Sequence, residues 1–344
     1  MDERQEIEKL KTENERIRTE IHALHETNKE LVELLSQVLD DIQMVNQHMK
    51  EQEMGRVANE NHIQNLPYEI FDPRVRDTKY KIPKILSIPE TVDQIVAGKS
   101  IARFGDGEIG IMCDEARWRF QRTDERLAKR LEQVIRSDEP EILIGLNDFY
   151  GDLDYANEPY LDALRAYITP ETRAKHMQFL NLDRVYANAL ISRNANWDIV
   201  KEQKRIWDGR DAIFVEGYQT RMGVGNNLFD NIHSIRRILC PAENAFDRYD
   251  EILAECLKQS KDDLILIALG PTASVLAYDL AKEGYHAVDI GHADITYEWL
   301  LRSGGKGREA IPGKYSNESV NGYLVEDIHD PEYERQIISD LSGR

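Results

Sequence analysis

Residues 264–274 read Leu-Ile-Leu-Ile-Ala-Leu-Gly-Pro-Thr-Ala-Ser, and this stretch decides the fold class. Its apolar run 264–269 predicts a strand, Gly270 predicts a turn, and the residues from Thr272 onward predict a helix. Similar short apolar runs alternate with helix-like stretches such as 124–136 and 246–259. The other predicted strands are 100–104, 141–146, 185–191, 212–216, 235–239 and 287–290. We therefore predict an α/β fold with a layered, largely parallel sheet and flanking helices.

The first helix of this domain is predicted from its start and stop signals. Ser87 and Glu90 have the spacing of a capping box, and Gly98 fits a helix end near Ala97. We place the domain at residues 86–302. Residues 303–344 are predicted to be a C-terminal loop and tail, with a short helix from Pro331.

Residues 1–54 contain a heptad pattern whose a and d positions are all uncharged. Asn14 and Asn28 at a positions, together with complementary pairs such as Glu6 with Lys11, favour a parallel dimer through residues 7–49. Farther along, the flanks of the seam also turn apolar, so that stretch either packs on the domain or supports a higher oligomer. The a and d positions are Ile7, Leu10, Asn14, Ile17, Ile21, Leu24, Asn28, Leu31, Leu35, Val38, Ile42, Val45 and Met49, and the apolar flanks are Val32, Leu34 and Leu39. We predict an N-terminal parallel coiled coil, joined to the domain by an extended linker at residues 55–85.

Composition excludes several classes of protein. The formal net charge is −19, from 63 acidic and 44 basic residues, which argues against a nucleic-acid partner. The three cysteines form no CxxC pair, which favours reduced thiols in the cytoplasm. No apolar stretch approaches the roughly 18 residues of a membrane-spanning helix. We expect a cytoplasmic protein without a membrane span.

The loop after the strand 100–104 is the first candidate site. Asp106 and Glu108 are two residues apart, so in an extended segment their carboxylates would point to the same side. Two oxygen ligands suit Mg²⁺ or Mn²⁺ holding a diphosphate. A solvated turn is the alternative interpretation, because acidic-x-acidic triplets are common in so acidic a chain.

Two further loops could bind phosphate. After the strand 212–216, the turn at Gly223 and Gly225 exposes backbone N–H groups beside Arg221. After the strand 264–269, the segment Gly270-Pro271-Thr272 begins a helix, whose N-terminus has free N–H groups. Ordinary turns would look the same, since neither segment is a P-loop or a full GxGxxG motif.

The fourth loop follows the last predicted strand. His292 could be a metal ligand or a base, and Asp294 or Glu298 could accept a proton from an attacking hydroxyl. The sequence does not choose among the three, and each of them alone could be structural. No GxSxG, HExxH or kinase motif set is present, so acyl transfer and zinc hydrolysis have little support.

Taken in order, these loops resemble the GT-D glycosyltransferases. The matching segments lie within residues 86–302 and are 103–108, 221–229, 238–246, 269–273 and 289–299. The resemblance implies a Rossmann-like fold, a nucleoside-diphosphate sugar donor, and a DxE motif for the metal, which here is Asp106 and Glu108. Where the family usually has Asp, this chain has Asn227, so the metal or ribose role of that position is in doubt.

This resemblance leads to a functional hypothesis. A metal-dependent glycosyltransferase would move a sugar, with UDP-sugar as the expected donor, to a glycan or glycoconjugate acceptor, which could also hold the protein near a membrane. The donor would contact residues of the first three loops, and the base would be Asp294, Glu298 or His292. The expected donor-binding residues are Arg103, Arg221, Gly223, Gly225, Asn226, Asn227, Gly270, Pro271 and Thr272. The alternatives are a metal-dependent phosphohydrolase or nucleotidyltransferase, or a non-catalytic coiled-coil assembly protein.

Overall fold

The computed structural model describes residues 3–69, 82–114, 120–151, 161, 164, 168–193 and 196–343. The chain divides into two units, Met1–Arg56 and Val57–Arg344. Among the described helices, none is long and apolar enough to cross a bilayer.

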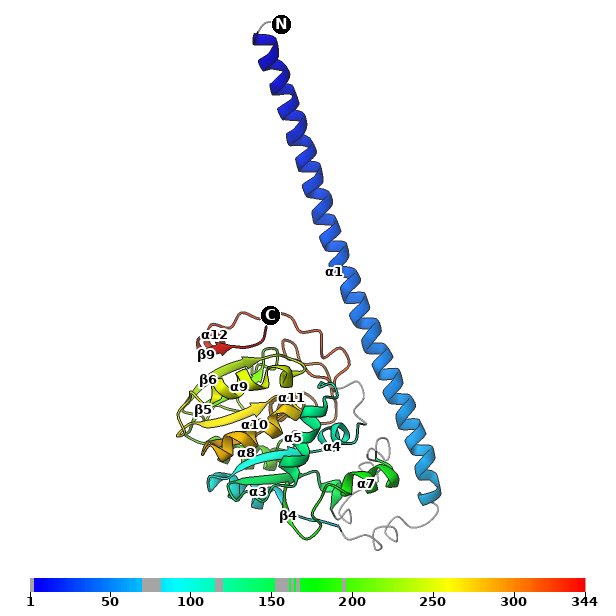
Figure 1. Ribbon diagram of the computed structural model, residues 1–344, viewed down its shortest axis with the longest axis vertical. Coiled ribbons are helices and arrows are strands. Elements are labelled where there is room, and N and C mark those ends of the chain that lie inside the picture. The colour runs from blue at the N-terminus through cyan, green and yellow to red at the C-terminus, as the bar shows by residue number, and fades with distance from the viewer. Residues whose placement is uncertain are drawn as a thin grey trace. The chain divides into compact units, whose positions relative to one another are not determined.

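The N-terminal unit is one continuous helix, α1 (Glu3–Glu69) (Figure 1). Helix formation through residues 7–49 agrees with the heptad pattern, although the pairing of copies stays a prediction. The large apolar residues of the seam that are described are exposed on the single chain, with exposed fractions between 43% at Ile17 and 66% at Leu24. Exposed apolar surface of this extent along one seam is typical of a helix that pairs with another helix.

The predicted extended linker is wrong over residues 55–69, because α1 runs through them. Gly55 costs a helix only about 1 kcal/mol, and no proline follows until Pro67, so loss of the heptad pattern does not end the helix. Two more residues of the predicted linker form strand β1 (Lys84–Ile85), which pairs with β4. Residues 70–81 of this linker lie outside the described residues.

Strands of the second unit form a sheet of nine in the order β1-β4-β3-β2-β8-β7-β5-β6-β9, and all their pairings are parallel. The strands predicted from apolar runs are all confirmed, with ends shifted by a few residues. They are β2 (Ser100–Phe104), β3 (Ile142–Leu146), β4 (Val185–Asn188), β5 (Asp211–Gly217), β6 (Ser234–Cys240), β7 (Leu264–Ala268) and β8 (His286–Asp289). This is the predicted layered α/β fold.

Helices cover both faces of the sheet. Strand β5 shows why, because Ile213 and Val215 belong to one apolar core while Ala212 and Phe214 belong to the other. The first core is covered by α4 (Asp106–Met112), α5 (Glu125–Ile135), α9 (Tyr249–Cys256) and α10 (Pro271–Lys282). The second is covered by α3 (Ile88–Val96), α8 (Trp197–Trp207) and α11 (Ala293–Ser303). The remaining described helix before β4 is α7 (Pro170–Met177).

The start of α3 confirms the predicted capping box. The Ser87 hydroxyl accepts a hydrogen bond from Glu90 N, and the Glu90 carboxylate accepts one from Ser87 N at 2.8 Å. Gly98 follows the helix with φ of +103°, a conformation that favours glycine.

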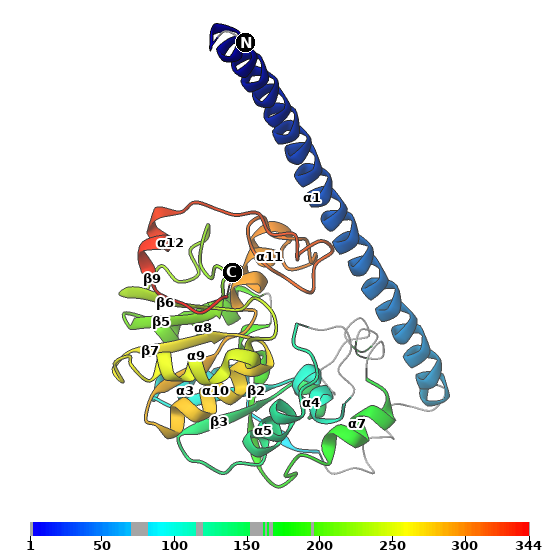
Figure 2. The same ribbon diagram turned by 45° about the horizontal axis from the view of Figure 1, so that its top comes forward.

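The C-terminal segment is more than a loop and tail. The predicted helix from Pro331 is confirmed as α12 (Pro331–Gln336), and it is followed by strand β9 (Ile337–Asp340), which pairs with β6 at the edge of the sheet (Figure 2). Between α11 and α12 the chain has no regular structure, yet Ile311, Lys314, Ser316 and Ser319 are buried. This segment is therefore part of the folded domain.

Candidate functional site

The four candidate loops follow strands β2, β5, β7 and β8, which are neighbours in the order β2-β8-β7-β5. All four strands are parallel, so their carboxyl ends meet at one edge of the sheet. Ligands bind at this edge in open α/β sheets. The structure thus brings together loops that are up to 190 residues apart in the sequence.

Asp106 and Glu108 lie at this edge, in the first turn of α4. The prediction that they sit in an extended segment is wrong, because Gly105 acts as the N-cap and helix begins at once. Glu108 turns back to accept a hydrogen bond from Gly105 N at 2.8 Å. Burial raises the pKa of Glu108, and the nearby charges of Asp289 and Asp106 add to this effect. Residues two apart on a helix do not face each other, so the two carboxylates do not point to the same side as an extended segment would place them.

Arg103, at the end of β2, is held by protein atoms. Its Nε and Nη2 donate to the Asp289 carbonyl and carboxylate at 2.7 and 2.8 Å, and its Nη1 donates to Ala189 O at 2.9 Å. A Cβ atom at Gly291 would lie 2.1 Å from Arg103 Nη2, and Gly291 has φ of +44°. Arg103 therefore joins the ends of β4 and β8 and fixes the loop that leads to His292.

Arg221 is also engaged, and it is buried. Its Nη1 donates to the carbonyl oxygens of Gly313 and Glu326, both at 2.7 Å, and its Nη2 lies 3.5 Å from Asp327 Oδ1. The sequence predicted a phosphate-binding arginine here. The structure instead places this guanidinium against the C-terminal segment.

Asp294 and Glu298, two of the three predicted bases, are buried on α11 and share Lys314. Lys314 Nζ donates to Asp294 Oδ2 at 2.6 Å and to Glu298 Oε1 at 3.2 Å. Lys314 is itself buried, and Arg302 Nε also donates to Glu298 Oε2 at 3.3 Å, so two cations face the two carboxylates. Buried ionic groups persist only when they are paired in this way.

The same two carboxylates hold the glycine turn after β5. Asp294 Oδ1 accepts hydrogen bonds from Gly223 N at 2.9 Å and from Asn226 Nδ2 at 2.8 Å. Asn226 Nδ2 also donates to Glu298 Oε1 at 2.7 Å. Burial opposes ionisation of Glu298, but the hydrogen bond from Asn226 and the charge of Lys314 leave its pKa below the usual value. With three donors on Asp294, these carboxylates fix the glycine turn.

The remaining residues of that turn differ in their surroundings. Gly223 must be a glycine, because it has φ of +77° and a Cβ there would lie 2.9 Å from Phe229. Gly225 has φ of +79° but faces open space. Asn227 Oδ1 accepts a hydrogen bond from the Tyr297 hydroxyl at 2.7 Å, so the amide at this departure from the family pattern has a partner on α11.

The turn Gly270-Pro271-Thr272 begins α10 as predicted. Gly270 has φ of +53°, and the Phe120 ring lies where a Cβ would be, at 2.6 Å. Thr272 is buried, and its hydroxyl donates to Gln121 Oε1 at 3.4 Å. Phe120 and Gln121 therefore cover this helix end, which leaves a ligand less access to it than the sequence suggested.

His292, the third predicted base, is the N-cap residue of α11 and is half-buried. Its Nδ1 lies 3.5 Å from Glu318 Oε1. The pKa of His292 is lowered to about 4. Burial is the largest cause, the positive charges of Arg193, Arg103 and Arg308 act in the same direction, and the charge of Glu318 opposes them. The imidazole is therefore neutral at pH 7.

Arg193 links His292 and Glu318 to the carboxyl pair on α4. It donates to Glu318 Oε1 at 2.5 Å, and its side chain keeps 42% of its surface exposed. Burial alone would lower the pKa of Arg193, but the charges of Glu318, Asp106 and Glu108 raise it. Arg308 donates to the other oxygen of Glu318 at 2.9 Å.

Two buried polar atoms next to β2 lack a hydrogen-bond partner among the described residues. They are Asn147 Oδ1, after β3, and Ser192 Oγ, after β4. Such atoms are rare in folded proteins and often face a ligand or water. Both lie at the same edge of the sheet as Asp106.

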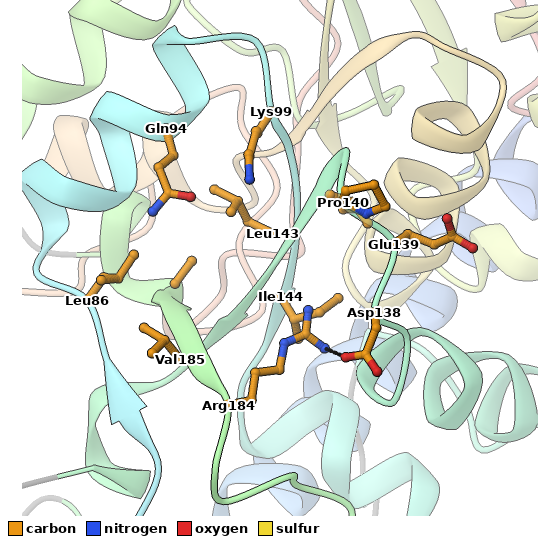
Figure 3. Close-up of a pocket in the computed structure, with 12 residues that line it drawn as sticks. Leu86, Gln94, Lys99, Asp138, Glu139, Pro140, Leu143, Ile144, Arg184 and Val185 are labelled. Carbon is orange, nitrogen blue, oxygen red and sulfur yellow. Dashed lines mark ion pairs between the residues drawn. The ribbon is translucent and has the colours of Figure 1, made fainter.

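A hollow of about 350 Å³ lies at the opposite edge, where β3 and β4 begin (Figure 3). Its lining includes Lys99, Gln94 and the ion pair of Arg184 with Asp138. None of the predicted site residues lines it. The chemistry expected from the sequence therefore belongs to the carboxyl edge.

The sequence analysis missed Arg193, Arg308, Lys314 and Glu318. Arg193 had a detectable signal, because it follows a predicted strand as the site loops do. The other three lie in residues 303–344, where no periodicity or motif predicts contact with His292, Asp294, Glu298 or Arg193.

Most of the domain matches a known protein family. Residues 101–319 match the glycosyltransferase GT-D fold family. A probable glycosyl transferase of Streptococcus gordonii is 32% identical over 270 residues, and glycosyltransferase GlyD of Streptococcus pneumoniae serotype 4 is 34% identical over 272 residues. Both alignments span 75% of this chain but only 39% and 32% of those relatives. The chain thus covers less than two thirds of the length of the curated relatives it matches.

Solved structures resemble the same region. A domain of unknown function 1792, described as having a distinct glycosyltransferase fold, is 34% identical with a TM-score of 0.69, covering 76% of this chain and 96% of its own. A glycosyltransferase of this type from Streptococcus sanguinis is 31% identical with a TM-score of 0.68, covering 75% of this chain and 99% of its own. Both the sequence and the fold of the domain are therefore shared.

Proposed function

Because the chain belongs to the GT-D glycosyltransferase family, we propose that it transfers a sugar from a nucleoside-diphosphate sugar, UDP-sugar in the first place, to a glycan acceptor. One observation supports this most: loops distant in the sequence meet at the carboxyl edge of adjacent strands, with the Asp106–Glu108 pair beginning α4 there. An acidic pair at this edge fits a cation-held diphosphate, the leaving group of such a transfer.

The residues present fit a divalent cation bound partly by its ligand. Among the described residues, no group of three or more His, Cys, Asp or Glu side chains could hold a metal. Asp106 and Glu108 would supply two carboxylates, and substrate phosphates with water would complete the shell, as is usual for Mg²⁺. The orphaned Asn147 Oδ1 adds an oxygen at the same edge. A bound Mn²⁺ or Mg²⁺ would neutralise charge on the departing diphosphate.

Arg193 and Arg308 are the cations that we assign to the phosphates. Both are partly exposed at the carboxyl edge, with 42% and 68% of the side-chain surface accessible. Arg103 and Arg221 are instead proposed to position the loops around the site, because their guanidinium groups are held by carbonyl and carboxylate oxygens.

We assign the role of base to His292. Asp294 and Glu298 are buried and bound to Lys314, so they are proposed to position the turn Gly223–Asn226. His292 is neutral and half-buried at the end of β8, and could accept the proton of an acceptor hydroxyl.

We further propose that α1 joins two copies in a parallel coiled coil through residues 7–49, with a higher oligomer as the alternative. The exposed seam and Asn14 and Asn28 at a positions support two parallel chains. Two domains on one coil would raise the effective concentration at an acceptor glycan displayed in many copies.

The experiment that tests the proposed donor is a thermal-shift titration with nucleoside-diphosphate sugars, with and without Mn²⁺. A donor at about 100 times its Kd should stabilise the domain by about 2.7 kcal/mol, or roughly 5 °C. We expect this shift only with Mn²⁺, and its loss in Asp106→Asn and Glu108→Gln. Asp138→Asn, at the other edge of the sheet, is the matched control and should keep the shift. No shift with any donor would contradict the proposal, and release of phosphate or pyrophosphate without sugar transfer would indicate a hydrolase or nucleotidyltransferase.

A further inference from the structure

Glu318 belongs to the irregular segment between α11 and α12, yet it lies beside the proposed base. Its Oε1 accepts a hydrogen bond from Arg193 and lies 3.5 Å from His292 Nδ1, while its Oε2 accepts one from Arg308. The carboxylate thus touches groups from three separate parts of the chain: the end of β4, the end of β8, and the segment itself.

Glu318 is ionised wherever the protein is folded and active. Burial alone would raise its pKa, but the charges of Arg193 and Arg308 lower it to about 2. His292 is neutral at the same pH, so its ring carries one proton, either on Nδ1 or on Nε2.

The position of that proton follows from electrostatics. A lone pair on Nδ1 would face the Glu318 carboxylate and be repelled, whereas an Nδ1–H would be attracted. His292 Nδ1 makes no hydrogen bond to any described residue, Glu318 included, so the carboxylate at 3.5 Å acts on it through its charge alone. The tautomer with Nδ1 protonated leaves Nε2 with a free lone pair.

We propose that Glu318 is a positioning residue that keeps His292 in the Nδ1–H tautomer, so that Nε2 is the atom that takes the proton from the acceptor hydroxyl. This inference rests on the proposed glycosyltransferase function and on the role of His292 in it. A carboxylate that orients a histidine for base catalysis is a known arrangement in other enzymes, and here it is supplied by a segment with no recognisable motif.

The step balances as follows. The acceptor O–H gives its proton to His292 Nε2, and the acceptor oxygen forms a bond to the anomeric carbon of the donor sugar. The bond between that carbon and the diphosphate oxygen breaks, and its electron pair leaves with the diphosphate. The imidazolium that results is stabilised by the negative charge of Glu318.

Substrate binding would strengthen His292 as a base. The charged groups that act on His292 are Glu318 and the three arginines Arg193, Arg103 and Arg308. A diphosphate on Arg193 and Arg308 would cancel part of their positive charge, which now lowers the pKa of His292. The pKa of His292 should therefore rise toward neutral pH when the donor binds.

The test is ¹⁵N NMR of the full chain labelled at histidine, with the His292 signal assigned by its absence in His292→Gln. In the ligand-free wild type, Nδ1 should give the shift of a protonated nitrogen and Nε2 that of an unprotonated one. In Glu318→Gln this preference should be lost, while Glu318→Asp should retain much of it. Glu309→Gln, which removes an exposed carboxylate in the same segment, is the matched control and should leave the spectrum unchanged.

Activity provides the second readout. Glu318→Gln should reduce kcat by more than the roughly twofold that an even mixture of tautomers would cause, because the imidazolium also loses the stabilising charge of Glu318. Glu318→Asp should restore part of it. A wild-type His292 protonated on Nε2, or a tautomer unchanged in Glu318→Gln, would overturn the inference. The NMR result needs no substrate, so absence of any sugar transfer would contradict the proposed function and leave the tautomer measurement standing.

Discussion

Single buried charges organise the carboxyl edge of this sheet. Lys314 binds two carboxylates of α11, Arg221 binds carbonyl oxygens of the C-terminal segment, and buried Arg237 pairs with Glu216 in β5. Glu216 in turn accepts a hydrogen bond from Met222 N at 2.7 Å, next to the glycine turn. Each charge links a loop to a strand, a helix or another loop. The loops of the proposed site are therefore fixed by ion pairs and hydrogen bonds, although they form no helix or strand.

Replacing Lys314 tests this electrostatic support. Lys314→Met would leave buried Asp294 without a cation and Glu298 with Arg302 alone, and should lower the free energy of unfolding by about 3–5 kcal/mol. Urea unfolding followed by tryptophan fluorescence measures this in the domain alone, because every tryptophan of the chain lies beyond residue 57. The exposed Lys306→Met is the control, with an expected change within about 0.5 kcal/mol. Equal stability of the two variants would contradict the account.

Gly291 lies in the loop that leads to His292, and Gly225, in the turn after β5, is its matched control. Both have positive φ, but only a Cβ at Gly291 would collide, at 2.1 Å from Arg103 Nη2. Gly225→Ala should cost about 1–2 kcal/mol from backbone strain alone. Gly291→Ala should cost more and also displace Arg103, which would reduce sugar transfer. Equal effects of the two changes on unfolding and on activity would show that Arg103 does not fix this loop.

The pH dependence of activity follows from the low pKa of His292. Because the free enzyme binds a proton there only near pH 4, kcat/KM should stay level from pH 7 to about 5 and fall below that. The free energy of unfolding should also fall as the pH drops from about 6.5 toward 4. In this range the histidine takes up a proton in the unfolded chain but not in the folded one. A pH–rate profile that loses half its kcat/KM near pH 6.5 would mean that burial does not lower the pKa of His292.

At the scale of elements, apolar runs predicted strands well and polar segments poorly. Strands such as β7 are buried on both faces, so hydrophobicity alone marks them. The Asp106–Glu108 segment was expected to be extended after the strand 100–104, but Gly105 caps a helix instead. Residues 55–69 lost the heptad pattern and still continue α1, because a helix ends at a stop signal rather than where its apolar seam ends.

The seam of α1 can be tested for its proposed role in pairing two copies of the chain. Leu24→Asp places a charge in the seam and should convert the protein to a monomer, because a buried unpaired carboxylate is costly. Lys29→Asp, outside the seam on the same helix, should leave assembly intact. Size-exclusion chromatography with light scattering gives the molar mass. A wild-type protein of 39.8 kDa would contradict the coiled coil, and one larger than two chains would favour the higher oligomer.

For the whole molecule, the sequence predicted the fold and the loops of the proposed site. It did not predict the contacts that the C-terminal segment makes with those loops. The α/β alternation and the loops after β2, β5, β7 and β8 are local signals, and parallel pairing alone brings them together. The contacts of Lys314 and Glu318 depend on how the C-terminal segment crosses back over the sheet, which no local pattern encodes. That segment supplies the cation that binds Asp294 and Glu298, which is why we propose His292 rather than either carboxylate as the base.

The most direct measurement is transfer of a labelled sugar from the donor that shifts the melting temperature to a glycan acceptor, with Mn²⁺ present. The account predicts labelled product with the wild-type chain and a loss of about 10²-fold or more in Asp106→Asn and Glu108→Gln, with Asp138→Asn unaffected. Transfer that continues at the wild-type rate in the Asp106 and Glu108 variants would contradict it.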